Sequence, residues 1–195
     1  MCVMDQKTIE QELLRVVHSH EHGAIIMAEL PEENYLDATS ASVKTLLDDG
    51  FEGVYISFQR PFDNLKSIFL RKDIDINKLL VIDVASALAK QSKVLHDRCI
   101  HIDNKLDINE LVRAIYISLP KLISIKKFVF IDSISTISLH KPLSETLRFS
   151  EFLIRTIKKT PLSGSTFLIF NVASGLSQKK FIRDIALRVE ETIRE

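Results

Sequence analysis

The segment FVFID, Phe128 to Asp132, is a short apolar run that ends in a carboxylate. Four similar runs occur along the chain: AIIMA at 24–28, VYISF at 54–58, LLVID at 79–83 and TFLIF at 166–170. They are rich in β-branched and aromatic residues and apolar at nearly every position, which is typical of strands buried on both faces of a parallel sheet. We therefore predict a mainly parallel sheet of at least five strands.

Segments with helical spacing of apolar residues separate these runs, and parallel strands need such crossovers. The segment 37–49 precedes Gly50, which we expect to cap the end of a helix. Asp107 and Glu110 have the spacing of a capping box, and Pro120 interrupts the helix that they open.

Three further helices are expected. One begins near the N-terminus, where Thr8 and Gln11 resemble another capping box, one covers 143–159, and the last carries an apolar stripe from Phe181 to Ile193. The alternation predicts an α/β protein, a three-layer α/β/α sandwich. We expect one domain over 1–195, with an N-terminal helix and lead-in at 1–22, a core at 23–171 and a C-terminal helix at 172–195.

Composition excludes several classes of function. The 195 residues are 46% apolar, enough for one substantial core. Lys plus Arg equals Asp plus Glu at 26 each, so no overall field attracts nucleic acid or an anionic membrane. The three Lys-Lys pairs, at 126–127, 158–159 and 179–180, could form a local basic face for nucleic acid, but we favour solvated ends of helices and strands. No apolar run approaches the ~20 residues that cross a bilayer.

Cysteine and histidine usage gives no metal motif. Cys2 and Cys99 lie far apart without metal-like spacing, and the N-terminus lacks a signal peptide, so we expect a cytoplasmic protein. His18, His20 and His22 alternate and could ligate a metal in an extended segment. They lie at a helix end, where histidine also complements the helix dipole, so we expect a structural or solvent-exposed role and predict no metal site.

With these elements placed, the chain resembles the RecA-like ATPases, and among them the KaiC-like family common in archaea. FVFIDSISTI, 128–137, is similar to the family's Walker B strand, with Asp132 and Ser133 at its end. GVYISFQRP, 53–61, resembles the strand that usually reads GVYVSFEEP, and LLVIDVAS, 79–86, resembles the next one. ETLRFSEFLIRTIKK and STFLIFNVAS follow where the family has its next helix and strand. The ordered motifs cover 23–171 and imply a RecA-like fold.

The stretch ELPEENYL lies where this family has the phosphate loop GPPGSGKT. The resemblance places Tyr35 at the lysine and Leu36 at the threonine, with only Pro31 retained. The degenerate loop consists of Glu29, Leu30, Pro31, Glu32, Glu33, Asn34, Tyr35 and Leu36. Glycines, lysine and threonine normally cradle the phosphates, neutralise their charge and hold magnesium. All of these groups are missing here.

Electrostatics decides how serious this loss is. A carboxylate from Glu29, Glu32 or Glu33 at ~4 Å from a phosphate charge would cost about 1 kcal/mol even in bulk water. Gln59 and Arg60 replace the acidic pair of the family, and neither is a general base. We therefore predict no catalytic residues and no ATP or magnesium cofactor. Asp132 remains at the Walker B position, where it could equally cap the following turn.

Three functions compete. The first is a catalytically inactive regulatory or scaffold protein that binds another protein, such as an active KaiC-like ATPase or a second copy, with Arg60 acting in trans. The second is a nucleotide or small-ligand binder that uses Asp132, Ser133, Asn171, Gln59 and Arg60 at the carboxyl ends of the strands. The third is an enzyme of another kind, for which the sequence offers no nucleophile and base. We rank them in that order.

Overall fold

A computed structural model describes residues 6–89, 95–102, 107–159 and 165–194. The strands form one sheet in the order β4-β3-β2-β5-β6-β1-β7, and every pair of neighbours is parallel. Their bounds are β1 Ile25–Leu30, β2 Glu52–Ser57, β3 Leu79–Asp83, β4 Cys99–His101, β5 Lys126–Asp132, β6 Ser165–Ala173 and β7 Glu191–Ile193. The five predicted strands are confirmed, with β4 and β7 added at the edges.

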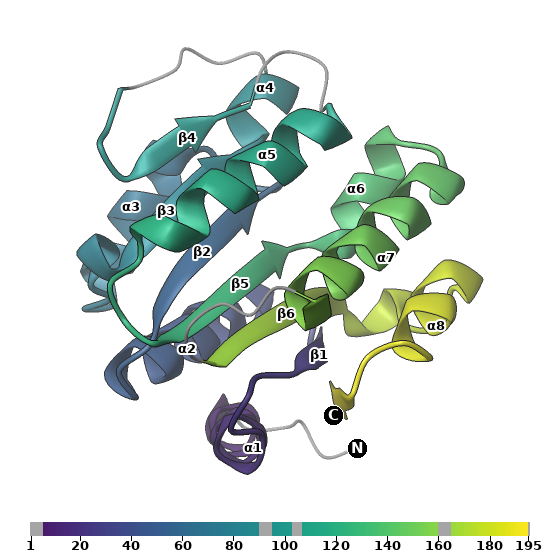
Figure 1. Ribbon diagram of the computed structural model, residues 1–195, viewed down its shortest axis with the longest axis horizontal. Helices are drawn as coiled ribbons and strands as arrows, with labels where there is room; N and C mark the ends of the chain where they lie inside the picture. Colours follow the sequence, from purple (N-terminus) through teal and green to yellow (C-terminus); the bar gives the residue numbers. More distant parts are fainter. Residues whose placement is uncertain (1–5, 90–94, 103–106, 160–164, 195) are drawn as a thin grey trace.

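Helices cover both faces of the sheet. Their bounds are α1 Gln6–Ser19, α2 Tyr35–Asp48, α3 Phe62–Arg71, α4 Ala85–Leu88, α5 Ile108–Ser118, α6 Ile134–His140, α7 Leu143–Lys159 and α8 Lys180–Ala186. Short 3₁₀ turns lie at Ile76–Lys78, Leu119–Lys121 and Ser174–Leu176. Figure 1 shows α5, α6 and α7 in front of the sheet, with α2 and α3 behind it.

The alternation of side chains along each strand divides the core in two. In β1, Ile26 and Ala28 pack with the residues of α1, α2 and α3, whereas Ile25 and Met27 pack with those of α5, α6, α7 and α8. Strands that are buried on both faces need apolar residues at every position, as the sequence has. The predicted three-layer α/β/α architecture is confirmed.

Gly50 ends α2 as predicted. Its φ of 87° lies in the left-handed region that favours glycine. Its N–H donates to the Leu47 carbonyl at 3.2 Å, and the N–H of Phe51 donates to the Leu46 carbonyl at 3.1 Å. These two bonds form a Schellman motif, which satisfies carbonyls left open at the helix end.

Other predicted helix boundaries have mixed outcomes. The Asp107 carboxylate accepts from Asn109 N–H at 2.8 Å, so Asp107 caps α5 as expected, and Pro120 lies in the 3₁₀ turn that follows the helix. The capping box at the N-terminus is wrong, because α1 already includes Gln6 and Thr8 therefore lies inside the helix. Residues before Gln6 lie outside the described part of the chain.

The predicted C-terminal helix at 172–195 is also wrong. Val172 still belongs to β6, α8 ends at Ala186, and Ile193 lies in β7. Strand β7 pairs with β1, where Ile193 lies opposite Ala28. A strand of three residues is too short to show the alternation that identifies a strand. Ile193 therefore fitted the helical spacing of the apolar residues before it.

The expectation that the lysine pairs are solvated is wrong for Lys127, and His18 and His20 contact separate acidic residues. Lys126 and Lys127 begin β5, where the buried Lys127 ammonium donates to the Leu119 carbonyl at 3.3 Å. His18 contacts Asp49 at 3.0 Å, whereas His20 lies 3.7 Å from Glu191. None of the described helices is long and apolar enough to cross a membrane.

Candidate functional site

The loop at the carboxyl end of β1 is shorter in the structure than the sequence suggested. Glu29 and Leu30 are the last residues of β1, and Tyr35 and Leu36 are the first of α2. Only residues 31–34 connect the two elements. Asn34 takes the N-cap position, yet its side chain makes no capping hydrogen bond.

The acidic side chains of this loop do not act together as expected. The Glu29 side chain is 11% exposed and lies 3.0 Å from the Arg194 guanidinium, which follows β7. Glu32 and Glu33 are exposed, and the Glu32 carboxylate packs against Gly175 so closely that a Cβ on residue 175 would clash with it. The negative charge facing solvent at the loop therefore comes from Glu32 and Glu33, because Arg194 neutralises Glu29.

Tyr35 fills the space where the resemblance places a lysine. Its hydroxyl donates to Asp132 Oδ1 at 2.9 Å, and the hydroxyl of Tyr55 donates to Asp132 Oδ2 at 2.5 Å. Asp132 is fully buried. Each carboxylate oxygen thus has a neutral donor, one from the start of α2 and one from β2.

Burial governs the ionisation of this cluster. It raises the pKa of Asp132 above its ordinary value, while the hydrogen bonds from Tyr55 and Tyr35 and the charge of Arg60 act in the opposite direction. The pKa values of Tyr35 and Tyr55 are raised well above 10, first by burial and then by the charge of Asp132. Both tyrosines therefore remain neutral donors at physiological pH.

Arg60 and Gln59 lie beside this cluster. Arg60 Nη1 is 4.0 Å from Asp132 Oδ2, and the turn that carries it is fixed by Ser57 Oγ, which donates to the Arg60 carbonyl at 2.6 Å. Gln59 Nε2 donates to Ser133 Oγ at 3.2 Å. Within the chain itself, Arg60 thus has a partner, Asp132.

Ser133, rather than Asp132, caps the helix that follows β5. Its hydroxyl lies 2.8 Å from Ser135 Oγ and 2.8 Å from Thr136 Oγ1, and it accepts a bond from the N–H of Thr136. The alternative role considered for Asp132, capping the turn, is therefore wrong. The capping groups are the small hydroxyl residues after the strand, which leaves the Asp132 carboxylate for the tyrosines.

Asn171 joins the same region from β6. It is fully buried, and its Nδ2 lies 3.4 Å from Thr39 Oγ1 in α2. Its Oδ1 accepts no hydrogen bond from the described residues, and the same holds for the buried Oδ1 of Asn34. The structure therefore brings Tyr35, Gln59, Arg60 and Ser133 together around Asp132, with Asn171 on the neighbouring strand β6 and residues 31–34 in the loop before Tyr35, whereas Glu29 and Leu30 lie in β1.

Sequence reasoning missed Tyr55. It lies inside the apolar run 54–58, where a tyrosine reads as one more core residue. Strands β2 and β5 are neighbours in the sheet, with Ser57 opposite Asp132. Only this pairing places the Tyr55 hydroxyl against the carboxylate, since the two residues are far apart in sequence.

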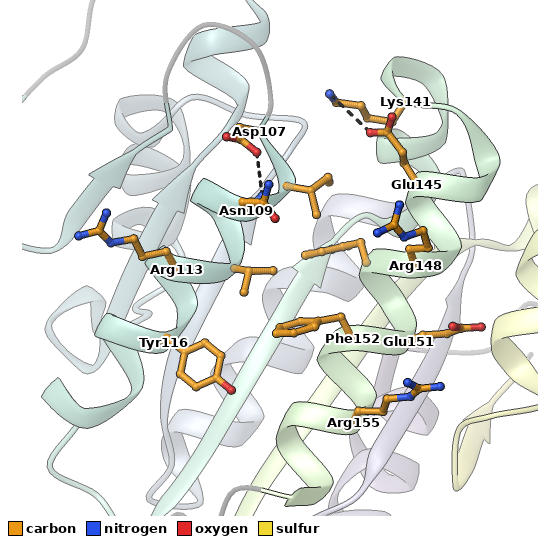
Figure 2. Close-up of a pocket in the computed structure, with 13 residues that line it drawn as sticks. Asp107, Asn109, Arg113, Tyr116, Lys141, Glu145, Arg148, Glu151, Phe152 and Arg155 are labelled. Carbon is orange, nitrogen blue, oxygen red and sulfur yellow. Dashed lines mark hydrogen bonds and ion pairs between the residues drawn. The ribbon is translucent and has the colours of Figure 1, made fainter.

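A groove lies elsewhere, between α5 and α7, with a volume of about 810 Å³. Figure 2 shows Tyr116 from α5 and Phe152 from α7 pointing toward each other across it. Both side chains are exposed, at 46% and 42%. Ile108, Val112 and Phe149 contribute further apolar surface between the helices.

The charges around the groove are unbalanced. Two of its acidic residues are paired, Glu145 with Lys141 at 3.7 Å and Glu151 with Arg188 at 2.9 Å, and the third, Asp107, caps α5. The remaining basic residues are exposed and form no ion pair or hydrogen bond with the described residues; they are Arg113, Arg148 and Arg155. Within the described part of the chain, the groove therefore combines exposed aromatic rings with three unpaired arginines and one unpaired carboxylate, that of Asp107, which leaves an excess of positive charge.

Comparisons with known proteins give structural likeness only. No family model and no curated protein matches the sequence. An uncharacterised protein from Pyrococcus horikoshii, crystallised in complex with an unknown peptide, is similar in structure at 15% identity and a TM-score of 0.67, over 93% of this chain and 81% of that chain. A KaiC-like protein from the same hyperthermophilic archaeon is similar at 13% identity and a TM-score of 0.54, over 85% and 68%. The chain has the RecA-like α/β fold of KaiC-like proteins.

Proposed function

We propose that this chain is a catalytically inactive RecA/KaiC-like domain that acts as a regulatory or scaffold protein by binding another protein. One observation carries the proposal. The Tyr35 hydroxyl, at the position of the phosphate-loop lysine, is bonded to the carboxylate at the Walker B position. The side chain that replaces the phosphate-binding lysine is therefore bonded to the carboxylate that would serve magnesium.

The chemistry of the loop supports inactivity. Phosphoryl transfer depends on a lysine, a magnesium ion and loop amides that approach the phosphates closely. Residues 31–34 contain no glycine, and Glu32 and Glu33 add negative charge at the loop. Freeing Asp132 for a metal would also require breaking its bonds with Tyr35 and Tyr55. Each effect opposes binding of magnesium and ATP.

The groove between α5 and α7 supports a protein partner. Aromatic residues and arginine are enriched at protein interfaces, and Tyr116, Phe152 and Arg148 provide both types here. We assign to this groove a peptide segment that combines apolar or aromatic residues with carboxylates. The peptide found with the similar Pyrococcus horikoshii protein is consistent with this kind of partner.

Titration calorimetry with ATP and magnesium tests inactivity directly. We expect no binding heat at millimolar nucleotide and no release of phosphate. Micromolar binding accompanied by hydrolysis would refute the proposal. An active KaiC-like ATPase measured in parallel shows that the assay detects turnover.

Affinity capture and cross-linking from cell extract test the partner. The wild-type chain should retain a specific protein that a Phe152→Ala, Arg148→Ala double variant loses. Ile123→Ala is the matched control, because Ile123 is 89% exposed and does not line the groove. A partner bound equally by the double variant would place the interface elsewhere.

A second candidate function rests on the orphaned carboxamide oxygens. Asn171 Oδ1 and Asn34 Oδ1 are buried acceptors without a partner among the described residues, which is a feature of some ligand sites. A small donor molecule, such as a nucleoside, would satisfy them. Calorimetry with nucleosides and nucleotides without magnesium, repeated on Asn171→Ala, distinguishes this function from the first.

A further inference from the structure

Three potential metal ligands meet at the edge of the sheet. Asp83 ends β3, and Cys99 and His101 lie in the edge strand β4. The register pairs Asp83 with His101 and Val81 with Cys99, so the three residues lie at adjoining positions of two parallel strands. Residues two apart on a strand point to the same face, which brings the thiol and the imidazole to one side.

The donor atoms are close enough to share one ion. Cys99 Sγ lies 3.5 Å from His101 Nε2, and His101 Nδ1 lies 3.4 Å from Asp83 Oδ2. One donor atom from each residue can be chosen so that all three lie within 4.8 Å of one another. Zinc bonds of ~2.0 to 2.3 Å in a tetrahedral arrangement separate neighbouring ligand atoms by roughly 3.5 Å. Small side-chain rotations would bring the three donors to that spacing.

The carboxylate is already oriented by its surroundings. Asp83 is fully buried, and its Oδ1 accepts from Ser86 N–H at 2.8 Å. Its Oδ2 accepts from Ser86 Oγ at 2.6 Å and from Phe62 N–H at 2.9 Å. Ligating carboxylates in metal sites are commonly held by such outer hydrogen bonds. Oδ1 accepts one bond and keeps a lone pair for a metal, whereas Oδ2 would exchange one of its two hydrogen bonds if it served as the ligand.

We propose that Asp83, Cys99 and His101 form a binding site for one divalent transition-metal ion of borderline softness, such as Zn²⁺. Mixed sulfur, nitrogen and oxygen ligands favour this class of ion over Mg²⁺ or Ca²⁺, which take oxygen ligands. The described residues supply three ligands, and a further group, such as solvent, completes the coordination. This site is separate from the Asp132 cluster and does not depend on the function proposed above.

The same three residues also resemble a nucleophile, base and orienting acid. Burial and the charge of Asp83 raise the pKa of the Cys99 thiol to about 12, so the thiolate that a nucleophile requires is scarce at neutral pH. A bound cation removes this obstacle, because it displaces the thiol proton to solvent as the metal–sulfur bond forms. The assignment to a metal therefore rests on the mixed sulfur, nitrogen and oxygen donors, which lie within 4.8 Å of one another.

Cobalt titration of the full chain provides the test. Co²⁺ should bind in a 1:1 ratio, with a near-ultraviolet sulfur-to-cobalt charge-transfer band and visible bands of a four-coordinate ion, and Zn²⁺ should abolish both. Cys99→Ser should remove the charge-transfer band, and His101→Gln should weaken binding at least ~10-fold. The control Cys2→Ser, which changes the other cysteine of the sequence, should retain both signals.

A second measurement does not depend on the variants folding. Alkylation of Cys99 in the wild-type chain, followed by peptide mass spectrometry, should slow markedly when Zn²⁺ is added and recover with a chelator. The proposal fails if the wild-type chain binds no stoichiometric Co²⁺, or if a folded Cys99→Ser, His101→Gln double variant keeps the same spectrum. Unchanged alkylation in the presence of Zn²⁺ would also overturn it.

Discussion

The hydroxyl of Tyr35 donates a hydrogen bond of 2.9 Å to Asp132 Oδ1. The bond joins the first residue of α2 to the last residue of β5, which are 97 positions apart in sequence. A neutral hydroxyl thus contacts the buried carboxylate where the family resemblance places a lysine. The bond holds the end of the loop 31–34 against β5, at the carboxyl ends of the strands, where parallel α/β proteins bind ligands.

Replacing Tyr35 by phenylalanine should destabilise the fold. The substitution keeps the ring in the core and removes one donor from a buried carboxylate, which costs about 1–3 kcal/mol of unfolding free energy. Urea denaturation followed by circular dichroism measures this difference. The control is Tyr116→Phe, because Tyr116 is 46% exposed, and we expect that change to remain within about 0.5 kcal/mol. Equal stability of both variants would show that the Tyr35 bond contributes nothing.

Asp132 should give stability a characteristic dependence on pH. Because burial raises its pKa in the folded state, the carboxyl stabilises the fold below its unfolded pKa of about 3.9, and that contribution disappears as the pH rises through the folded pKa. The free energy of unfolding of the wild type, measured relative to Asp132→Asn, should therefore fall as the pH is raised above about 4. Comparing the two chains cancels the other titrating groups. A difference that rises with pH would mean that the pKa is lowered instead.

Gly50→Ala should cost about 1 kcal/mol, because a Cβ strains the left-handed backbone at this position. No atom lies within 4 Å of the added Cβ, so the loss is conformational rather than steric. Gly50→Asn should lose less, since asparagine adopts this conformation more readily. Thermal melts of the two variants give the comparison, and equal melting temperatures would contradict it.

Gly53→Ala should be more damaging for a different reason. A Cβ on residue 53 would lie 2.2 Å from the ring of Phe128 on the neighbouring strand β5. Such overpacking costs typically ~1–3 kcal/mol. Adding Phe128→Leu to Gly53→Ala should lower the cost of the glycine change, which a double-mutant cycle by urea denaturation would reveal. Additive costs would show that the ring moves aside freely.

Much of the fold could be predicted from the sequence. Runs that are apolar on both faces, such as 128–132, predict buried parallel strands. Gly50 and Asp107 predict where helices end or begin, because each favours a local capping conformation. The two edge strands were not predicted, since Cys99–His101 and Glu191–Ile193 are too short to show an alternation of apolar and polar residues. They become strands because β3 and β1 offer unpaired edges, which is a property of the assembled sheet.

The sequence by itself determined the five central strands, the helices near 37–49 and 143–159, and the absence of glycine, lysine and threonine from residues 29–36. Only the tertiary structure decided what occupies their place: Tyr35 reaches Asp132, and Tyr55 completes the pair from a neighbouring strand. Local patterns report on neighbours within a few residues. Contacts across parallel strands join distant segments through a register that the whole sheet fixes, as it also does for Asp83 and His101.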